Sequence, residues 1–342
     1  MIKPPALQIG DKVVIIAPAR KISLTDISVG VDTLKNWGLK VTFSEHLFDD
    51  CDQFAGADNV RAEDLQKAIN DKDVKAIFCA RGGYGTVRII DKIDFSPLID
   101  YPKWIIGFSD ITVLHSKLHT LGICSLHADV LTTFGDTKDS NMLYLKQILF
   151  DEKTEFHHKK LEQTNDNGNR YKIEGEIIGG NISILYSLLG SDCDINTAGK
   201  ILFLEDLDEY LYHIDRMMIC LKRAKKLDNL KALIIGDVSQ MNDNKIPFGK
   251  TAKEIIAETV SGYDYPVYYD FPAGHIKNNT PIIFGVPATM EISPNEINIK
   301  YKNPEVESSG KKYLRLLMYT VIFFLAIWGI FKLCALLLAK YL

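Results

Sequence analysis

The sequence WIIGFSDITVLHS, residues 104–116, decides the fold because it combines an apolar stretch, a tight turn and a helix-like stretch. Residues 104–106 predict a buried strand, and the helical pattern starts at Asp110 or Ile111. Such a turn lifts a serine hydroxyl above the carboxyl end of a sheet, beside the free N–H groups of a helix N-terminus. Ser109 is therefore a candidate nucleophile. The alternative interpretation is that Ser109 or Asp110 only caps the helix.

The same alternation of strand and helix extends from this stretch toward the N-terminus. Apolar segments at 12–19, 40–44 and 74–80 alternate with helix-like segments at 23–38 and 59–72. Continuous apolar strands separated by helices are typical of a parallel sheet covered on both faces. We therefore predict an α/β fold in which residues 1–150 form an N-terminal, doubly wound, mostly parallel sheet domain.

The second half of the chain resumes after a polar segment. Residues 151–172 are rich in turn formers and predict a connection between domains. Strand-like and helix-like segments then alternate up to a β-rich ending at 282–301. This pattern predicts a C-terminal mixed α+β, barrel-like domain over residues 173–302.

The C-terminal tail has a different composition. Residues 303–313 read as a linker, and residues 316–339 contain a single charge, Lys332. A helix of 24 residues is about 36 Å long, enough to cross a hydrocarbon core of about 30 Å. We predict a transmembrane helix over 314–339 that anchors a cytoplasmic catalytic domain to the inner membrane, because more Lys and Arg precede the span than follow it. The alternative is a buried or dimer-forming helix, and a homodimer stays open.

Composition limits the remaining classes of partner. Residues 1–310 carry a net charge of −9, because five of the 40 Lys and Arg lie in the tail. An acidic body does not favour nucleic acid as a partner. The six cysteines are scattered and predict reduced thiols. His115 and His119 lie one helical turn apart without H-E-x-x-H, so we expect no metal and no cofactor.

A glycine-rich loop, CARGGYGTVR at 79–88, follows another predicted buried strand. Adjacent glycines let a backbone approach a ligand closely and turn its N–H groups toward it. The loop lacks the Lys-Ser/Thr of a phosphate loop and does not match G-x-G-x-x-G. It predicts an oxyanion hole, and the alternative is a plain tight turn.

Two further segments supply a carboxylate and a histidine. The stretch ILFLEDLDEYLYHIDRM at 201–217 is a predicted buried strand that ends in Glu205 and Asp206, and carboxylates there can orient a histidine. His275, in DFPAGHIKNN at 270–279, follows a strand in a loop with Pro and Gly. The chain order Ser109, Glu205, His275 supplies nucleophile, orienting carboxylate and base. A solvated acidic loop is the alternative for the carboxylates.

Together these segments resemble the LD-carboxypeptidase family of serine peptidases, which includes muramoyltetrapeptide carboxypeptidases and microcin-immunity relatives. The matching stretches are LQIGDKVVIIAPAR, ARGGYGTVRIID, GFSDIT, GGNISIL, LFLEDLDEYLYHIDRM and PAGH. The resemblance implies that Ser109 is the nucleophile, Glu205 the orienting carboxylate and His275 the base. It also implies an oxyanion hole of backbone N–H groups, from Gly82 or Gly83 and from Asp110.

The resemblance further implies removal of the terminal D-alanine from murein tetrapeptide in cell-wall recycling. Arg81 and Arg216 are candidates to bind the terminal carboxylate, and structural ion pairs are the alternative. The sequence departs from the family at Leu211, where a proline often stands, and in its apolar tail, since the family is usually soluble. Two other functions stay open. One is hydrolysis of a peptidyl-nucleotide antibiotic, with Tyr210 or Tyr212 as the aromatic platform for its nucleobase. The other is a catalytically silent, membrane-tethered binding protein.

Overall fold

The computed structural model describes residues 1–151, 155–159, 162–163, 171–293 and 296–302. The predicted linker at 303–313 and the predicted span at 314–339 lie outside the described residues, so membrane attachment stays a prediction. None of the helices in the described part of the chain combines the length and the hydropathy that a bilayer crossing requires. Residues Met1–Lys302 cluster as one compact unit.

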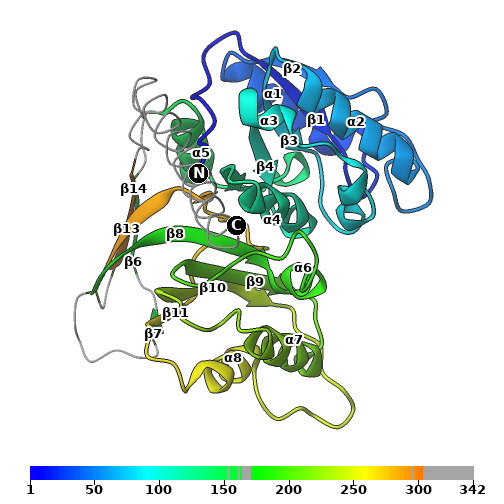
Figure 1. The fold of residues 1–342 in the computed structure, drawn as a ribbon. Coiled ribbons are helices and arrows are strands. Elements are labelled where there is room, and N and C mark those ends of the chain that lie inside the picture. The colour runs from blue at the N-terminus through cyan, green and yellow to red at the C-terminus, as the bar shows by residue number, and fades with distance from the viewer. Residues whose placement is uncertain (152–154, 160–161, 164–170, 294–295, 303–342) are drawn as a thin grey trace, which may run out of the picture. The chain divides into compact units, whose positions relative to one another are not determined.

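The first sheet has six strands in the order β12-β5-β4-β3-β1-β2 (Figure 1). The strands β1 to β5 run parallel, and β12 pairs antiparallel with β5. This arrangement confirms the predicted α/β fold, although β12 comes from the second half of the chain. The bounds are β1 Lys12–Ile16, β2 Lys40–Phe43, β3 Val74–Cys79, β4 Trp104–Gly107, β5 Ser125–His127 and β12 Ile282–Phe284.

Helices cover both faces of this sheet because successive side chains of a strand point to opposite faces. Val13 and Ile15 of β1 pack with α1 and α5, whereas Val14 and Ile16 pack with α2 and α4. The α-helices of this half are α1 Leu24–Asn36, α2 Asp58–Asn70, α3 Pro97–Asp100, α4 Thr112–Thr120 and α5 Asp139–Leu149. Four 3-10 helices join them: η1 Thr86–Arg88, η2 Ile90–Lys92, η3 Ser109–Ile111 and η4 Leu131–Thr133.

The strand order reverses direction at one point of the first sheet. The chain passes from β1 to β2 on one side and then returns to β3 on the other side of β1. In open α/β sheets, ligands bind in the crevice outside the carboxyl ends of the strands at such a switch point. The loops after β1 and β3 are therefore where a site is expected.

The second sheet has eight strands in the order β6-β14-β13-β8-β9-β10-β11-β7. Its centre, β8 to β11, is parallel, and its outer pairs are antiparallel. The strands are β6 Glu155–Lys159, β7 Glu162–Gln163, β8 Tyr171–Asn181, β9 Ile201–Leu207, β10 Ala232–Ser239, β11 Val267–Tyr269, β13 Pro287–Ser293 and β14 Glu296–Tyr301. The helices are α6 Ile182–Ser187, α7 Leu211–Arg223 and α8 Ala252–Val260.

This second sheet is open, and the barrel-like form predicted from sequence is wrong in that respect. Its edge strands β6 and β7 do not pair with each other in the described residues. The reason lies in β8, which pairs antiparallel with β13 over 171–176 and parallel with β9 over 177–181. The β-rich ending therefore pairs with the first half of β8 and does not close a barrel. The polar segment predicted as a connection contributes β6 and β7.

One apolar core extends over both sheets. Phe203 of β9 and Ile234 of β10 belong to the same buried cluster as Val13 and Ile15 of β1. The opposite face of the second sheet packs against α6, α7 and α8. Side chains from the two halves of the chain are thus held in one body.

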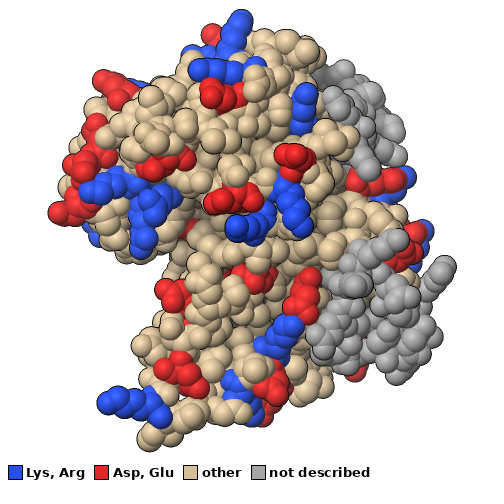
Figure 2. All heavy atoms as spheres, turned by 180° about the vertical axis from the view of Figure 1, so that it is seen from behind, with Lys and Arg blue, Asp and Glu red and all other residues tan. Residues whose placement is uncertain are grey.

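The exposed charges are mixed in sign. On the face that Figure 2 shows, Lys and Arg side chains alternate with Asp and Glu among the described residues. That distribution differs from the continuous basic surface typical of proteins that bind a nucleic-acid backbone. The five described cysteines, at 51, 79, 124, 193 and 220, are free thiols, which confirms that prediction for them.

Candidate active site

Ser109 lies at the sharp turn between β4 and α4. Its φ is +65°, a left-handed conformation that is uncommon for a residue with a Cβ. Gly107 allows this turn, because a Cβ there would lie 2.9 Å from Cγ1 of Ile111 and 3.2 Å from Cβ of Cys79. The residue before Ser109, Phe108, makes no side-chain cap for η3, and neither does Ile111 for α4. The Ser109 hydroxyl faces His275, with Oγ 3.0 Å from Nε2 of the imidazole.

The three side chains that the sequence analysis selected meet in one hydrogen-bonded chain. The Nδ1 atom of His275 lies 2.7 Å from Oε2 of Glu205, and its Nε2 atom lies 3.0 Å from Oγ of Ser109. Glu205 comes from β9, and His275 lies in the loop after β11. A neutral imidazole in this arrangement donates from Nδ1 to the carboxylate and accepts the Ser109 hydroxyl proton at Nε2.

Close packing of the loop holds His275 in place. Gly274 has a φ of +117°, and a Cβ there would lie 3.0 Å from Cβ and 3.1 Å from Oε2 of Glu205. The Gly274 N–H donates to Oδ1 of buried Asn279 at 2.9 Å. The Phe108 ring packs on the imidazole, with 4.9 Å between ring centroids. A larger residue at 274 would separate the carboxylate from the histidine.

Buried carboxylates surround the imidazole. Burial lowers the pKa of His275, but the charge and hydrogen bond of Glu205, with the charges of Asp206 and Asp237, outweigh it, so the pKa stands above 6.5. Burial, followed by the charge of Glu205, raises the pKa of Asp206 to about 7. Glu205 and Asp206 are buried, so the solvated-loop alternative is wrong for them, whereas Asp208 is exposed.

The glycine-rich loop lies directly against Ser109. A Cβ on buried Gly82 would lie 3.2 Å from Cβ of Ser109 and 3.5 Å from the backbone nitrogen of Asp110. Gly83, with a φ of +105°, follows it along the loop. Gly82 thus packs against the turn that carries Ser109 and Asp110, where the oxyanion hole is predicted.

Two buried side chains fix this loop. The Asp110 carboxylate accepts hydrogen bonds from the backbone N–H of Thr86 at 2.9 Å and from its Oγ1 at 2.6 Å. Burial raises the pKa of Asp110, and these hydrogen bonds lower it by less. Arg61, which is 2% exposed, donates to the carbonyls of Gly85 and Pro18. Asp110 therefore holds the glycine-rich loop through its side chain, a function that the sequence did not indicate.

An open pocket lined in part by Ser109 lies at the carboxyl end of β4. Of the two candidate arginines, Arg81 lines it and Arg216 does not. Arg216 is exposed on α7, with its guanidinium 5.4 Å from the centroid of the Tyr212 ring. Sequence reasoning missed Arg20, which lines the pocket from the loop after β1. The complete lining is Arg20, Asp26, Arg81, Gly82, Gly83, Phe108, Ser109, Val130, Thr132, Thr133, Leu207 and His275.

Of the two histidines on α4, His115 has a structural role, as its contacts show. His115 is buried and bridges Oγ of Ser125 at 2.8 Å and the Gly107 carbonyl at 2.9 Å. Burial lowers the pKa of His115 to about 4. His115 thus supports the turn behind Ser109. In the described part of the chain, no three His, Cys, Asp or Glu side chains group as metal ligands.

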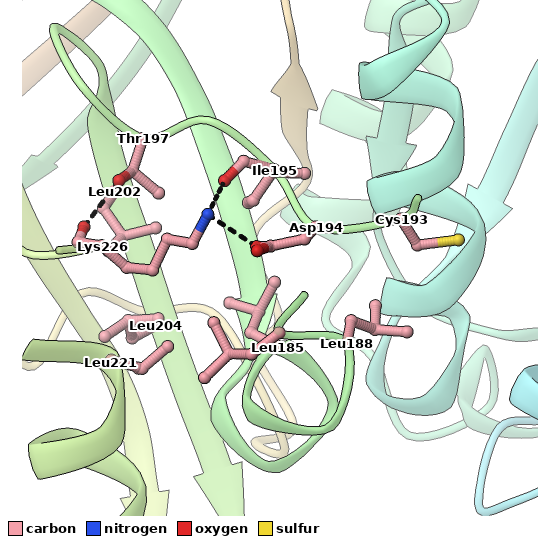
Figure 3. Close-up of a pocket in the computed structure, with 11 residues that line it drawn as sticks. Leu185, Leu188, Cys193, Asp194, Ile195, Thr197, Leu202, Leu204, Leu221 and Lys226 are labelled. Atoms are coloured by element: carbon pink, nitrogen blue, oxygen red, sulfur yellow. Dashed lines mark hydrogen bonds and ion pairs between the residues drawn. The ribbon is translucent and has the colours of Figure 1, made fainter. Parts of the chain in front are cut away.

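A second pocket lies under α6 and α7, away from Ser109 (Figure 3). Leucines such as Leu185 and Leu204 line it, and its accessible space is about that of one water molecule. Lys226 extends along its wall to Oδ1 of Asp194 at 2.7 Å and to the Ile195 carbonyl at 2.9 Å. It is a packing defect closed by an ion pair, and not a substrate site.

Comparisons with known proteins identify the family of this chain. Residues 13–128 match the LD-carboxypeptidase N-terminal domain, and residues 174–290 match the LD-carboxypeptidase C-terminal domain. A relative from Bacillus subtilis (strain 168), named "Probable murein peptide carboxypeptidase", is 34% identical over 84% of this chain and 91% of its own length. The "Murein tetrapeptide carboxypeptidase" of Pseudomonas aeruginosa is 27% identical over 83% of this chain and 94% of its own.

Solved structures share the fold over nearly their whole length. A muramoyltetrapeptide carboxypeptidase from Oxalobacter formigenes superposes with a TM-score of 0.76 and 25% identity, covering 85% of this chain and 99% of its own. The microcin C7 self immunity protein MccF superposes with a TM-score of 0.77, covering 88% and 99%. Its identity of 21% supports only the common fold. With both domain matches and the relative from Bacillus subtilis, the chain belongs to the LD-carboxypeptidase family and is a serine-type carboxypeptidase.

Proposed function

We propose that this enzyme removes the terminal D-alanine from murein tetrapeptide during cell-wall recycling, with Ser109 as nucleophile. The observation that carries the proposal is the continuous hydrogen-bonded chain from Glu205 through His275 to Ser109. It combines a nucleophile, a base within reach of the nucleophile, and a carboxylate that orients the base. The name of the relative from Pseudomonas aeruginosa supports the choice of substrate.

The reaction is an acyl transfer in two steps. Nε2 of His275 takes the proton from Ser109 as Oγ bonds to the carbonyl carbon between the L-centre and D-alanine. N–H groups of Asp110 and of Gly82 or Gly83 bind the oxyanion. The C–N bond then breaks, and His275 gives its proton to the leaving amine. His275 then takes a proton from water as its oxygen attacks the acyl-Ser109 ester, and returns that proton to Oγ of Ser109 as the C–O bond breaks and the tripeptide leaves.

Binding of the substrate requires a group for its free carboxylate. Arg81 is exposed and lines the Ser109 pocket, so it is suited to a bidentate contact with that carboxylate. Arg216 lies outside the lining, and its cation–π contact with Tyr212 favours the structural alternative for it. We therefore assign the carboxylate to Arg81.

A peptidyl-nucleotide substrate would need an aromatic platform for its nucleobase in the second half of the chain. Tyr210 and Tyr212 are exposed at the start of α7, with ring centroids 5.6 Å apart. Neither lines the Ser109 pocket. The murein peptide is thus the better-supported substrate.

The proposed place of action is the cytoplasmic face of the inner membrane. The charges that flank the predicted span at 314–339 support this orientation, with Lys311, Lys312 and Arg315 before it and Lys340 after it. The anchor would keep the enzyme where wall fragments enter the cell.

The choice between substrates is tested with the full chain. Purified enzyme is incubated separately with L-alanyl-D-glutamyl-meso-diaminopimelyl-D-alanine and with aspartyl sulfamoyl adenosine, and products are quantified by mass spectrometry. We expect release of D-alanine at a kcat/KM at least 100-fold above that for the nucleotide. Turnover of the nucleotide alone would replace the carboxypeptidase assignment with the antibiotic-hydrolase alternative.

A further inference from the structure

We infer that Arg20 and Arg81 act as a pair that binds the free carboxylate of the substrate's terminal residue, and that Arg20 is thereby a determinant of exopeptidase specificity. The inference rests on the proposed function, because it concerns the substrate of the same pocket. Four observations carry it: the topology, the packing of Arg20 on Gly83, the fixed backbone beneath Arg20, and the charges of the pocket.

The topology brings both arginines to the switch point of the first sheet. Strands β1, β3 and β4 are parallel neighbours, so their carboxyl ends meet at one edge. Arg20 lies four residues after β1, Arg81 two residues after β3, and Ser109 two residues after β4. The crevice between β1 and β3, where the order reverses, is the expected ligand position in such a fold. The fold itself therefore brings Arg20 and Arg81 to the edge of the sheet that carries Ser109, and all three residues line one pocket.

The Arg20 side chain lies against the glycine-rich loop, close to the reaction centre. A Cβ on Gly83 would lie 2.5 Å from Cδ and 2.8 Å from Nε of Arg20. The stem of Arg20 thus crosses the bare backbone of Gly83, and the neighbouring Gly82 contacts Ser109. A side chain at 83 would displace the Arg20 stem, and the φ of +105° also favours glycine there.

The backbone beneath Arg20 is rigid although its side chain is exposed. Arg20 forms a β-bridge with Phe54, and the Ala55 N–H donates to the Ala19 carbonyl at 3.1 Å. Buried Arg61 donates to the Pro18 carbonyl. A group mounted on a fixed backbone loses less conformational entropy when it binds a ligand.

The charges of the pocket leave both arginines available. Arg61 and Arg88 pair with Asp58, whereas among the described residues neither Arg20 nor Arg81 forms an ion pair or a side-chain hydrogen bond. Asp26 is the acidic residue of the lining, and its carboxylate accepts from the backbone N–H of Ser23 at 2.8 Å and from its Oγ at 2.9 Å. These hydrogen bonds, more than the charge of Arg81, lower the pKa of Asp26.

The resulting chemistry is that of a carboxylate receptor. Oδ2 of Asp26 is occupied in the capping box of α1, whose N-cap is Ser23, so the pocket presents two guanidinium groups and one carboxylate. Guanidinium groups bind planar carboxylates through two parallel N–H bonds. A substrate whose terminal carboxylate is blocked would lose these bonds and would leave the arginines without a partner.

The test compares the tetrapeptide acid with the same peptide carrying a C-terminal amide. The full chain, Arg20→Gln and Arg20→Lys are assayed for kcat/KM on both peptides. The control is Arg223→Gln, which removes an exposed arginine at the end of α7. We expect Arg20→Gln to lower kcat/KM on the acid about 10- to 100-fold, as for loss of a charged hydrogen bond, with a smaller change on the amide. Arg20→Lys recovers part of the loss, and Arg223→Gln changes neither value.

The outcomes separate this inference from the proposed function. An equal loss on acid and amide, or no loss on either, overturns the assignment of Arg20. If the wild-type chain cleaves neither peptide, the proposed function fails. The dissociation constants of the two peptides, measured by calorimetry, then test the role of Arg20 independently of catalysis. If the wild type binds the acid more tightly than the amide and Arg20→Gln loses this preference, the carboxylate receptor is supported. Equal binding of both peptides by the wild type refutes it.

Discussion

Glu205 is fully buried, and its charge offsets the effect of burial on the pKa of His275. At this scale the site depends on single atoms: one carboxylate oxygen, two ring nitrogens and one hydroxyl. The identities of Ser109, Glu205 and His275 could be predicted because each follows or ends an apolar strand. Arg20 could not, since its closeness to Ser109 depends on the order of strands in the sheet, which local patterns do not reveal.

Replacement of Glu205 by Gln tests the electrostatics of the base. His275 acts as a base when neutral, so kcat/KM of the wild type should rise as the pH passes through a value above 6.5. In Glu205→Gln the pKa of His275 falls, the acid limb moves to lower pH, and kcat drops by about 10⁴ because the tautomer is no longer fixed. Asp208→Asn, at an exposed carboxylate, is the control for pH–rate profiles. An unmoved acid limb would contradict this account.

Replacement of Gly82 by Ala tests the contact between the glycine-rich loop and the nucleophile. The new Cβ would lie 3.2 Å from Cβ of Ser109 and 3.3 Å from the Phe108 carbonyl oxygen, so the loop must move away. We expect kcat to fall about 10²-fold, through a misplaced oxyanion donor. Gly262→Ala adds a Cβ with nothing within 4 Å and should leave kcat unchanged. Full activity of Gly82→Ala would mean that this loop does not shape the site.

At the scale of elements, the site is held by contacts between short segments. Asp110 of η3 accepts hydrogen bonds from Thr86 of η1. Arg61 of α2 donates to a carbonyl in the loop after β1 and to one in the loop after β3. The sequence predicted the main strands because their apolar runs are continuous. It predicted neither β6 nor β7, because they are polar segments whose strand conformation depends on pairing with β14 and β11.

Thr86 offers a test of this coupling between η1 and η3. Thr86→Val removes the Oγ1 hydrogen bond to the buried Asp110 carboxylate and keeps the shape of the side chain. We expect the free energy of unfolding to fall by about 1–3 kcal/mol, together with a lower kcat. Thr86→Ser keeps the hydroxyl and should retain both the wild-type free energy of unfolding and the wild-type kcat. Equal urea unfolding midpoints and equal kcat for Thr86→Val and wild type would show that the hydrogen bond is dispensable.

On the scale of the whole molecule, a single core joins the two sheets, and β12 returns from the second half to complete the first. The nucleophile and its base come from opposite halves and are nevertheless fixed to within 3.0 Å. The alternation in the sequence predicted an α/β half followed by a mixed α+β half, but a strand as short as Ile282–Phe284 carries too little local signal to reveal its partner.

The predicted span gives a test on the same scale. The full chain should sediment with membranes and resist extraction at alkaline pH. Leu325→Arg with Ile327→Arg places two charges near the centre of the span, each at a cost of about 2.5–3.5 kcal/mol, and should release the protein. Lys332→Leu should leave it bound. Wild-type protein found entirely in the supernatant would contradict the anchor.

Release of D-alanine from the murein tetrapeptide, measured for the full chain beside Ser109→Ala, tests the central claim most directly. Ser140→Ala, at an exposed serine of α5, is the matched control. The account predicts release by wild type and Ser140→Ala, and a loss of at least about 10³-fold in kcat for Ser109→Ala with unchanged unfolding. Undiminished release by Ser109→Ala would contradict the assignment of the nucleophile.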